Sequence, residues 1–76
     1  MSRLLSAGVI GKELRKAREA AGLTQEEVAF RARISREYLG QIEREQKSPT
    51  VQVFVRVCKA MKVSAGQLLG RVERLM

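Results

Sequence analysis

Apolar side chains recur about every third or fourth residue along most of this chain, and no segment alternates as a strand would. A first apolar stripe predicts a helix of about three turns that ends at Gly22. A later stripe predicts a helix that follows Pro49 and is capped by Ser48 or Thr50. The inward positions of these stripes are Ile10, Leu14, Ala17 and Ala21 in the first helix, and Val51, Phe54, Cys58 and Met61 in the later one. The pattern therefore predicts an all-α fold.

Two short helices are predicted between these stripes. Thr24 can cap a helix by accepting a hydrogen bond from the Glu27 backbone N–H, while the Glu27 carboxylate accepts one from the Thr24 N–H. Ser35 repeats the cap after a turn at Ala32-Arg33-Ile34, so the helix before that turn has only about two turns. Two short helices at this spacing are typical of a helix-turn-helix, which makes sequence-specific DNA binding the leading hypothesis.

A fifth helix is predicted from Ser64 towards Glu73, because Ser64 and Gln67 have the spacing of a capping box. This helix carries two apolar rows, and only one row can face the core of so small a domain. We expect the surplus to form a two-fold contact between two copies, over residues of about 64–76 and part of the preceding helix. For Leu75 and Met76 a frayed helix end is the alternative. The residues expected at this contact are Val53, Val55, Leu69, Val72, Leu75 and Met76.

Length and charge add to this picture. The chain has 76 residues, which predicts a single domain over 1–76 made of five helices. Fifteen Lys and Arg against eight acidic residues give a formal net charge of +7, as expected of a protein that binds a polyanion. The apolar stretch near Leu4, Leu5, Val9 and Ile10 is too short and broken for a membrane span or a signal peptide. With Cys58 as the single cysteine, we expect a cytoplasmic location.

Several kinds of chemistry are disfavoured by composition. The chain has no histidine, no aspartate and one cysteine, so it lacks the usual zinc ligand sets and a Ser-His-Asp triad. Its six glycines form neither a P-loop nor a dinucleotide fingerprint. We therefore expect no metal, no cofactor and no enzymatic activity. Cys58 lies on a core stripe, and we expect it to be a buried structural residue.

Residues 22–29, 34–44 and 48–50 closely resemble the phage-repressor and Cro-like (XRE) helix-turn-helix family. The resemblance covers about 10–69 and implies a five-helix lambda-repressor-like domain, with the helix-turn-helix over about 24–44. In size the chain resembles the restriction-modification controller proteins. Arg33 and Glu45 depart from the family, which often has glycine at both positions; a left-handed backbone there costs about 1 kcal/mol relative to glycine. The resemblance also implies that Arg18 pairs with Glu43.

The helix after Ser35 is the expected recognition helix. A helical wheel places Leu39 and Ile42 on its inner side, and Glu37, Gln41 and Arg44 on the opposite side. We expect Arg36 to donate to guanine and Gln41 to contact adenine. Glu37 either accepts from cytosine or orients Arg36. The alternative for this helix face is a solvated surface without a ligand.

Residues around this helix are candidates for DNA phosphates, which fix register without reading sequence. By similarity to the family, Gln25 binds a phosphate at the start of its helix, where backbone N–H groups favour an anion. For Tyr38 the alternatives are a thymine methyl group or packing at the core edge, and for Lys47 a mobile surface side chain. The phosphate candidates are Thr24, Gln25, Ser35, Tyr38, Arg44, Lys47 and Ser48.

The sequence favours a transcriptional regulator, a repressor or controller protein, that binds a near-palindromic operator in double-stranded DNA as a homodimer. The alternative is a protein-interaction module of the same fold, such as a coactivator or a toxin–antitoxin partner. RNA polymerase is a further candidate partner, because some relatives contact it through an acidic residue at the Glu26 position. No membrane partner is expected.

Overall fold

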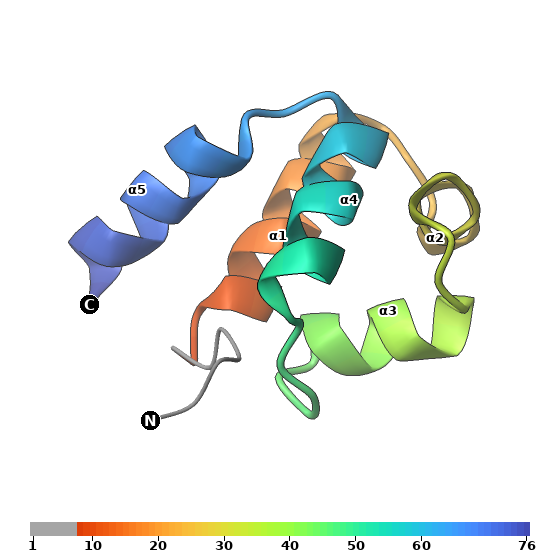
Figure 1. Ribbon diagram of the computed structural model, residues 1–76, viewed down its shortest axis with the longest axis horizontal. Helices are drawn as coiled ribbons and strands as arrows, with labels where there is room; N and C mark the ends of the chain where they lie inside the picture. Colours follow the sequence, from red (N-terminus) through yellow and green to blue (C-terminus); the bar gives the residue numbers. More distant parts are fainter. Residues whose placement is uncertain (1–7) are drawn as a thin grey trace.

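The computed structural model describes residues 8–76 as five helices without a strand in that range. They are α1 (Ile10–Ala20), α2 (Gln25–Ala32), α3 (Arg36–Glu43), α4 (Val51–Met61) and α5 (Ala65–Leu75). Figure 1 shows α1 and α4 in the middle of the molecule, with α2 and α3 on one side and α5 on the other. The fold expected from the sequence is confirmed over this range, whereas Leu4 and Leu5 lie outside it.

Four of the five helices begin at a side-chain cap. Thr24 and Glu27 form the reciprocal capping box of α2, with 3.0 Å from the Glu27 N to the Thr24 Oγ1 and 2.8 Å from the Thr24 N to the Glu27 Oε1. The hydroxyl groups of Ser35 and Ser64 cap α3 and α5. The α4 cap is Thr50, whose hydroxyl accepts from the Val53 N–H, so the choice between Ser48 and Thr50 falls on Thr50.

The start of α1 is held from a distant part of the chain. Val9 supplies no side-chain cap, and the backbone N–H of Lys12 donates instead to Glu45 Oε2 at 2.8 Å. Glu45 follows α3 and has a left-handed backbone, with a φ of 62°. Its carboxylate therefore stabilises the positive end of α1, a contribution that glycine at this position would lack.

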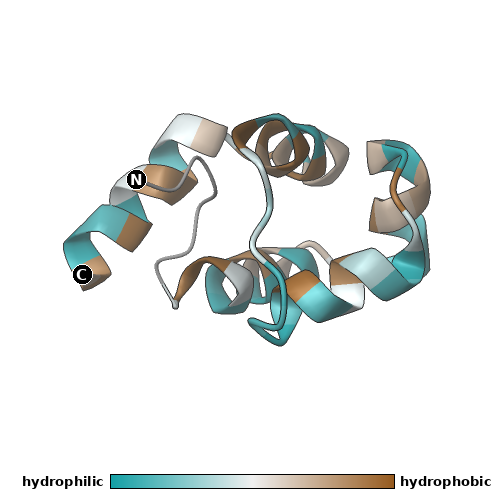
Figure 2. Ribbon diagram, turned by 60° about the horizontal axis from the view of Figure 1, so that its bottom comes forward, coloured by the Kyte–Doolittle hydropathy of each residue, from teal (hydrophilic) through white to brown (hydrophobic). Residues whose placement is uncertain are grey.

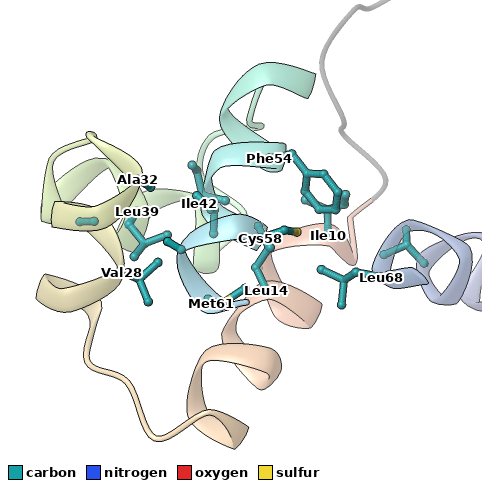
Figure 3. Packing of buried hydrophobic residues seen from close by; sticks show 14 residues of the cluster. Ile10, Leu14, Val28, Ala32, Leu39, Ile42, Phe54, Cys58, Met61 and Leu68 are labelled. Atoms are coloured by element: carbon teal, nitrogen blue, oxygen red, sulfur yellow. The ribbon is translucent and has the colours of Figure 1, made fainter. Parts of the chain in front are cut away.

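Buried side chains from all five helices form one core (Figure 3). Phe54, Val57, Cys58 and Met61 supply the inner face of α4. Val51 was predicted on this face but is 56% exposed. It is the first residue of α4, and a helical side chain leans towards the N-terminus, which carries Val51 past the edge of the core. Burial of Cys58 is confirmed, and this burial raises the pKa of its thiol to about 11.

The apolar stripe of α1 is one turn shorter than its pattern predicted. Ile10 and Leu14 are buried and Ala17 is partly buried, but Ala21 is exposed. Ala21 is the C-cap of α1, and the chain turns away there towards Gly22, which has a φ of 71°. The helix therefore ends before the stripe does. All five helices combine hydrophobic and hydrophilic residues, as expected for helices that pack on one side (Figure 2).

Candidate nucleic-acid interface

Helix α3 divides into a buried and an exposed side as predicted. Leu39 and Ile42 have no exposed surface, whereas Arg36 and Glu37 are exposed and Gln41 is partly buried. The eight residues of α3 are too few to be stable without packing, so its buried side fixes how its polar side is presented. Arg36, Glu37 and Gln41, whose polar groups can contact the edges of bases, therefore lie on a helix whose opposite side packs against the core.

An ion pair between α1 and the end of α3 contributes to this rigidity. Arg18 donates through Nε to Glu43 Oε2 at 2.7 Å and through Nη2 to Glu43 Oε1 at 3.0 Å. The third guanidinium nitrogen, Nη1, donates to the carbonyl of Leu23 at 3.0 Å. The hydrogen bond to Glu43 is the main cause of a raised pKa for Arg18. The pairing implied by the family resemblance is confirmed.

Gln25 extends this network to the exposed surface. Its Nε2 donates to Glu43 Oε1 at 3.0 Å, and its Oε1 accepts from Arg36 Nη1 at 3.4 Å. The residue that orients Arg36 in this structure is Gln25, whereas Glu37 was expected as one candidate for that role. Because the Gln25 amide is bonded on both sides, its use for a phosphate remains a prediction that depends on the backbone N–H groups at the start of α2.

The hydroxyl groups of Thr24 and Ser35 each accept a backbone N–H, which leaves the O–H of each free to donate outwards. Both residues are exposed. An open hollow at this end of α2 is lined by Arg18, Leu23, Thr24, Gln25, Glu26 and Arg36. The two cap residues that are predicted to contact phosphates thus lie near Arg36.

Arg44 lies close to Gly40, on the outer side of α3. A Cβ atom at position 40 would stand 3.0 Å from Arg44 Nη1 and 3.7 Å from Gln25 Nε2. Arg44 also donates to Gln46 Oε1 at 3.2 Å, so Gln46 holds this guanidinium in place. Glycine at position 40 therefore leaves room for two of the predicted DNA-contacting side chains. The role of Gln46 carried no signal in the sequence, since its partner is fixed only by the backbone after α3.

The loop after α3 turns back on the helix through the Gln46 and Lys47 N–H groups, which both donate to the Gln41 carbonyl. Lys47 is exposed and Ser48 is partly buried. Tyr38 is partly buried and packs against the core, which agrees with the core-edge interpretation of its ring. We call the residues Thr24, Gln25, Ser35, Arg36, Glu37, Gln41, Arg44 and Lys47 the α3 surface.

The predicted dimer residues divide into two groups. Leu69, Leu75 and Met76 are 41%, 54% and 79% exposed, and Val53 and Val55 are partly buried. Val72 is only 2% exposed, so its prediction as an interface residue is wrong. It lies one turn after Leu68 and, like Leu68, belongs to the core (Figure 3 shows Leu68). The row that faces inwards is therefore the one through Leu68 and Val72.

Glu13 is a buried carboxylate, 2% exposed, that the sequence did not single out. Lys16 lies 3.3 Å from it on α1, and Arg71 of α5 lies 3.8 Å from it. This cluster joins the C-terminal helix to the first helix.

Among residues 8–76 there is no group of three potential ligands that could hold a metal ion, and no helix in that range has the length and hydropathy of a membrane span.

The helix-turn-helix family matches this chain over residues 14–68. The chain is 38% identical over 74 residues to the transcriptional regulator ClgR of Mycobacterium tuberculosis (strain CDC 1551 / Oshkosh). This match covers 88% of this chain and 66% of that protein. This chain thus spans slightly less than two thirds of the length of that relative. The HTH-type transcriptional regulator ImmR of Bacillus subtilis is 34% identical over 64 residues, or 84% of this chain and 50% of that protein.

Solved structures show the same arrangement of helices. The crystal structure of the clp gene regulator ClgR from C. glutamicum has a TM-score of 0.85 and 30% identity, over 95% of this chain and 94% of that one. The restriction-modification controller protein C.AhdI from Aeromonas hydrophila has a TM-score of 0.74 and 32% identity, over 78% of this chain and 89% of that one. Because the ClgR structure aligns with 95% of this chain, its agreement extends over nearly all of the five helices.

Proposed function

The chain belongs to the XRE-type helix-turn-helix family, and from this membership we propose that it is a DNA-binding transcriptional regulator rather than an enzyme. In this proposal α3 enters the major groove. Arg36 donates to guanine, Gln41 contacts adenine and Glu37 accepts from cytosine. DNA binding also places the protein in the compartment that holds the DNA, in agreement with the cytoplasmic location expected from the sequence.

The single observation that carries the proposal is the chain of contacts Arg18–Glu43–Gln25–Arg36. It leads from the buried Glu43 carboxylate through Gln25 to the exposed Arg36, whose Nη1 lies 3.4 Å from Gln25 Oε1, so it restricts the position of a donor before any ligand arrives. A positioned donor loses less conformational entropy on binding than a free arginine does, which favours recognition of one base over general attraction to DNA.

Phosphate contacts around the base readers would set the register of the protein on the duplex. Arg44 and Lys47 supply charge at the C-terminal end of α3, and the start of α2 supplies N–H groups at its other end. The remaining candidates are Thr24, Gln25, Ser35, Ser48 and the Tyr38 hydroxyl. The net charge of +7 supports this arrangement because counterion release from DNA rewards each neutralised phosphate.

We further propose a homodimer through α5 and the outer side of α4. Leu69 is exposed in the middle of α5, Leu75 is exposed in its last turn and Met76 follows as its C-cap, and hydrophobic colouring reaches the C-terminal end of this helix (Figure 2). Exposed apolar side chains of this kind support an interface between two copies. Val53 and Val55 are the further candidates on α4; both are partly buried, and Val53 also packs against the core. A two-fold contact here would place two copies of α3 about 34 Å apart and would require a near-palindromic operator.

Glu26 is exposed in the first turn of α2, beside the α3 surface. Its position supports RNA polymerase as a further partner of the DNA-bound protein. The names of the relatives suggest two regulatory settings, control of clp genes and control of restriction-modification. The protein-interaction module of the same fold is the competing proposal, and the α3 surface argues against it because a partner-binding module has no need of base-reading side chains.

The proposal is tested by selection of bound duplexes from a random DNA pool. We expect enrichment of a near-palindromic sequence with a guanine at the same position of each half-site. The Arg36→Ala variant should select the same site without preference at that guanine. Failure to enrich any sequence, at a concentration where the protein is folded, would contradict the proposal.

A further inference from the structure

A second concentration of positive charge lies at the opposite end of α2 from Gln25. A hollow of about 400 Å³ is lined by Arg31, Arg33, Arg56, Lys59, Ala60 and Lys62. Five of the fifteen basic residues of the chain therefore line one small hollow. Because α2 has eight residues and rises about 1.5 Å per residue, its two ends are roughly 12 Å apart. None of the predicted base or phosphate contacts lines this hollow.

Two of the guanidinium groups are fixed by backbone carbonyls. Arg56 of α4 donates through Nε to the Ala32 carbonyl at the end of α2, at 3.0 Å. In return, Arg31 of α2 donates through Nη1 to the Ala60 carbonyl near the end of α4, at 3.4 Å. An arginine has five N–H donors, so each group keeps further donors for a ligand. The hollow thus has positioned donors as well as charge.

The partial negative charges at the ends of α2 and α4 do not neutralise the five cations of the hollow. The C-terminal end of a helix carries about half a negative charge, so the ends of α2 and α4 together offset about one of the five cations. The four ion pairs of the described part of the chain use other basic residues. Glu27 lies one turn before Arg31 and offsets part of its charge, while the Glu27 carboxylate accepts a hydrogen bond from the Thr24 N–H at 2.8 Å. The hollow therefore retains a surplus of several positive charges.

Two of the five cations occupy positions where glycine would be favoured. Arg33 and Lys62 have left-handed backbones, with φ of 63° and 60°, at the C-caps of α2 and α4. A side chain at such a position costs free energy that glycine avoids. Arg33 and Lys62 both line the same hollow, whereas Glu45, the third non-glycine residue with a left-handed backbone among residues 8–76, lies elsewhere. Strain of this kind persists where the side chain has a use.

We propose that this hollow binds the phosphate chain of a small polyphosphorylated ligand, such as a nucleoside polyphosphate. Guanidinium and ammonium groups are the usual partners of phosphate oxygens, and four of the five cations are exposed, so a phosphate chain can reach them. Arg33 belongs to the turn that joins α2 to α3, so an occupied hollow would contact the segment that sets the position of the α3 surface. The proposal extends the function above and does not depend on DNA binding.

Isothermal titration of the full chain with inorganic tripolyphosphate tests this site. We expect binding with one ligand per chain. The double variant Arg33→Gly with Lys62→Gly should weaken this binding by about tenfold or more. It should also raise the denaturation midpoint, because glycine relieves two left-handed positions. A variant that loses tripolyphosphate binding but has a higher denaturation midpoint cannot have lost this binding through misfolding.

The matched control is Arg15→Ala with Arg74→Ala, which removes the same charge from exposed helix positions outside the hollow. We expect this variant to bind tripolyphosphate within about twofold of the unaltered chain. Equal weakening by both variants, or no binding by the unaltered chain, would overturn the proposal. If the Arg33→Gly, Lys62→Gly variant loses duplex affinity, measured without tripolyphosphate, by as much as it loses tripolyphosphate affinity, the proposal is also overturned, because the cluster would then be a further DNA contact; a failure of the unaltered chain to bind DNA would leave the tripolyphosphate result unchanged.

Discussion

Arg18 and Glu43 join α1 to the end of α3 through two hydrogen bonds, of 2.7 Å and 3.0 Å. The Glu43 side chain is 2% exposed and the Arg18 side chain 12% exposed, so solvent screens the pair very little. Since Glu43 also accepts from Gln25, which in turn holds Arg36, a buried ion pair and an exposed base reader form one continuous network. The fold and the α3 surface therefore depend on the same carboxylate.

Removal of the Glu43 carboxylate should be strongly destabilising. We expect Glu43→Ala to lower the free energy of unfolding by about 3–5 kcal/mol, because it leaves the Arg18 cation without its partner. Urea denaturation followed by circular dichroism measures this change. The control is Glu19→Ala, which breaks the exposed pair with Arg15 and should cost less than about 1 kcal/mol. Similar losses in the two variants would show that the buried pair is not special.

Gly11 should be irreplaceable at the contact between α1 and α3. A Cβ atom at position 11 would overlap the carbonyl oxygen of Ile42, and the backbone on both sides is held in a helix. We expect Gly11→Ala to lower the free energy of unfolding by about 3 kcal/mol or more. Gly66→Ala on α5 is the matched control, since its nearest neighbour is 3.8 Å away; it should raise stability by about 0.5–1 kcal/mol. A neutral Gly11→Ala variant would refute the close approach of the two helices.

The α2 capping box should make stability depend on pH. Hydrogen bonds with Thr24, first to its backbone N–H and then with its side chain, lower the pKa of the Glu27 carboxyl. A lowered folded-state pKa contributes stability that is present above the ordinary pKa of about 4.5 and is lost as the pH falls through the folded-state value. Glu27→Gln should therefore be more destabilising at pH 7 than at pH 3, as measured by thermal denaturation. A difference that stays constant between these pH values would contradict this role of the carboxylate.

If the proposed dimer forms through exposed apolar side chains of α5, charged substitutions at these positions should give a monomer. Leu69→Glu with Leu75→Glu should leave the helical content unchanged, because both side chains are exposed, and should abolish dimers in sedimentation velocity. Phe30→Glu is the control, since this residue is 85% exposed on α2, on the other side of the molecule from α5 (Figure 1). An unaltered chain that is monomeric at high micromolar concentration, or a double variant that still dimerises, would show that the interface is assigned wrongly.

Local features of this fold are readable from the sequence because their causes are local. The Thr24 and Ser35 caps, and the left-handed positions of Arg33 and Glu45, depend on neighbours within a few residues or on the family pattern. The contact from Glu45 to the start of α1 joins residues 33 positions apart, so no local spacing could indicate it. The burial of Val72 could not be predicted for the same reason. When a helix carries two apolar rows, only the position of the neighbouring helices decides which row faces the core.

The candidate residues of the α3 surface can be predicted from the sequence in part. The outward face of α3 follows from helical periodicity, which gave Arg36, Glu37 and Gln41 as candidate base readers. The support of Arg36 by Gln25 could not be predicted in this way, because it requires the relative placement of α2 and α3. The five cations of the hollow are likewise dispersed over 32 positions and gather only when the ends of α2 and α4 meet.

In the proposed function α3 reads DNA sequence while the residues around it bind phosphate. Equilibrium binding of the unaltered chain, Arg36→Ala and Lys47→Ala to the selected site at several salt concentrations separates these two roles. We predict that the logarithm of the binding constant falls by about 0.9 per phosphate contact for each unit in the logarithm of salt concentration, several units in total. Arg36→Ala should lose about 1–3 kcal/mol on the selected site and little on a site changed at its guanine. Lys47→Ala should weaken binding to both sites alike and flatten the salt dependence. A salt-independent binding constant, or an equal loss on both sites for Arg36→Ala, would contradict DNA recognition by α3.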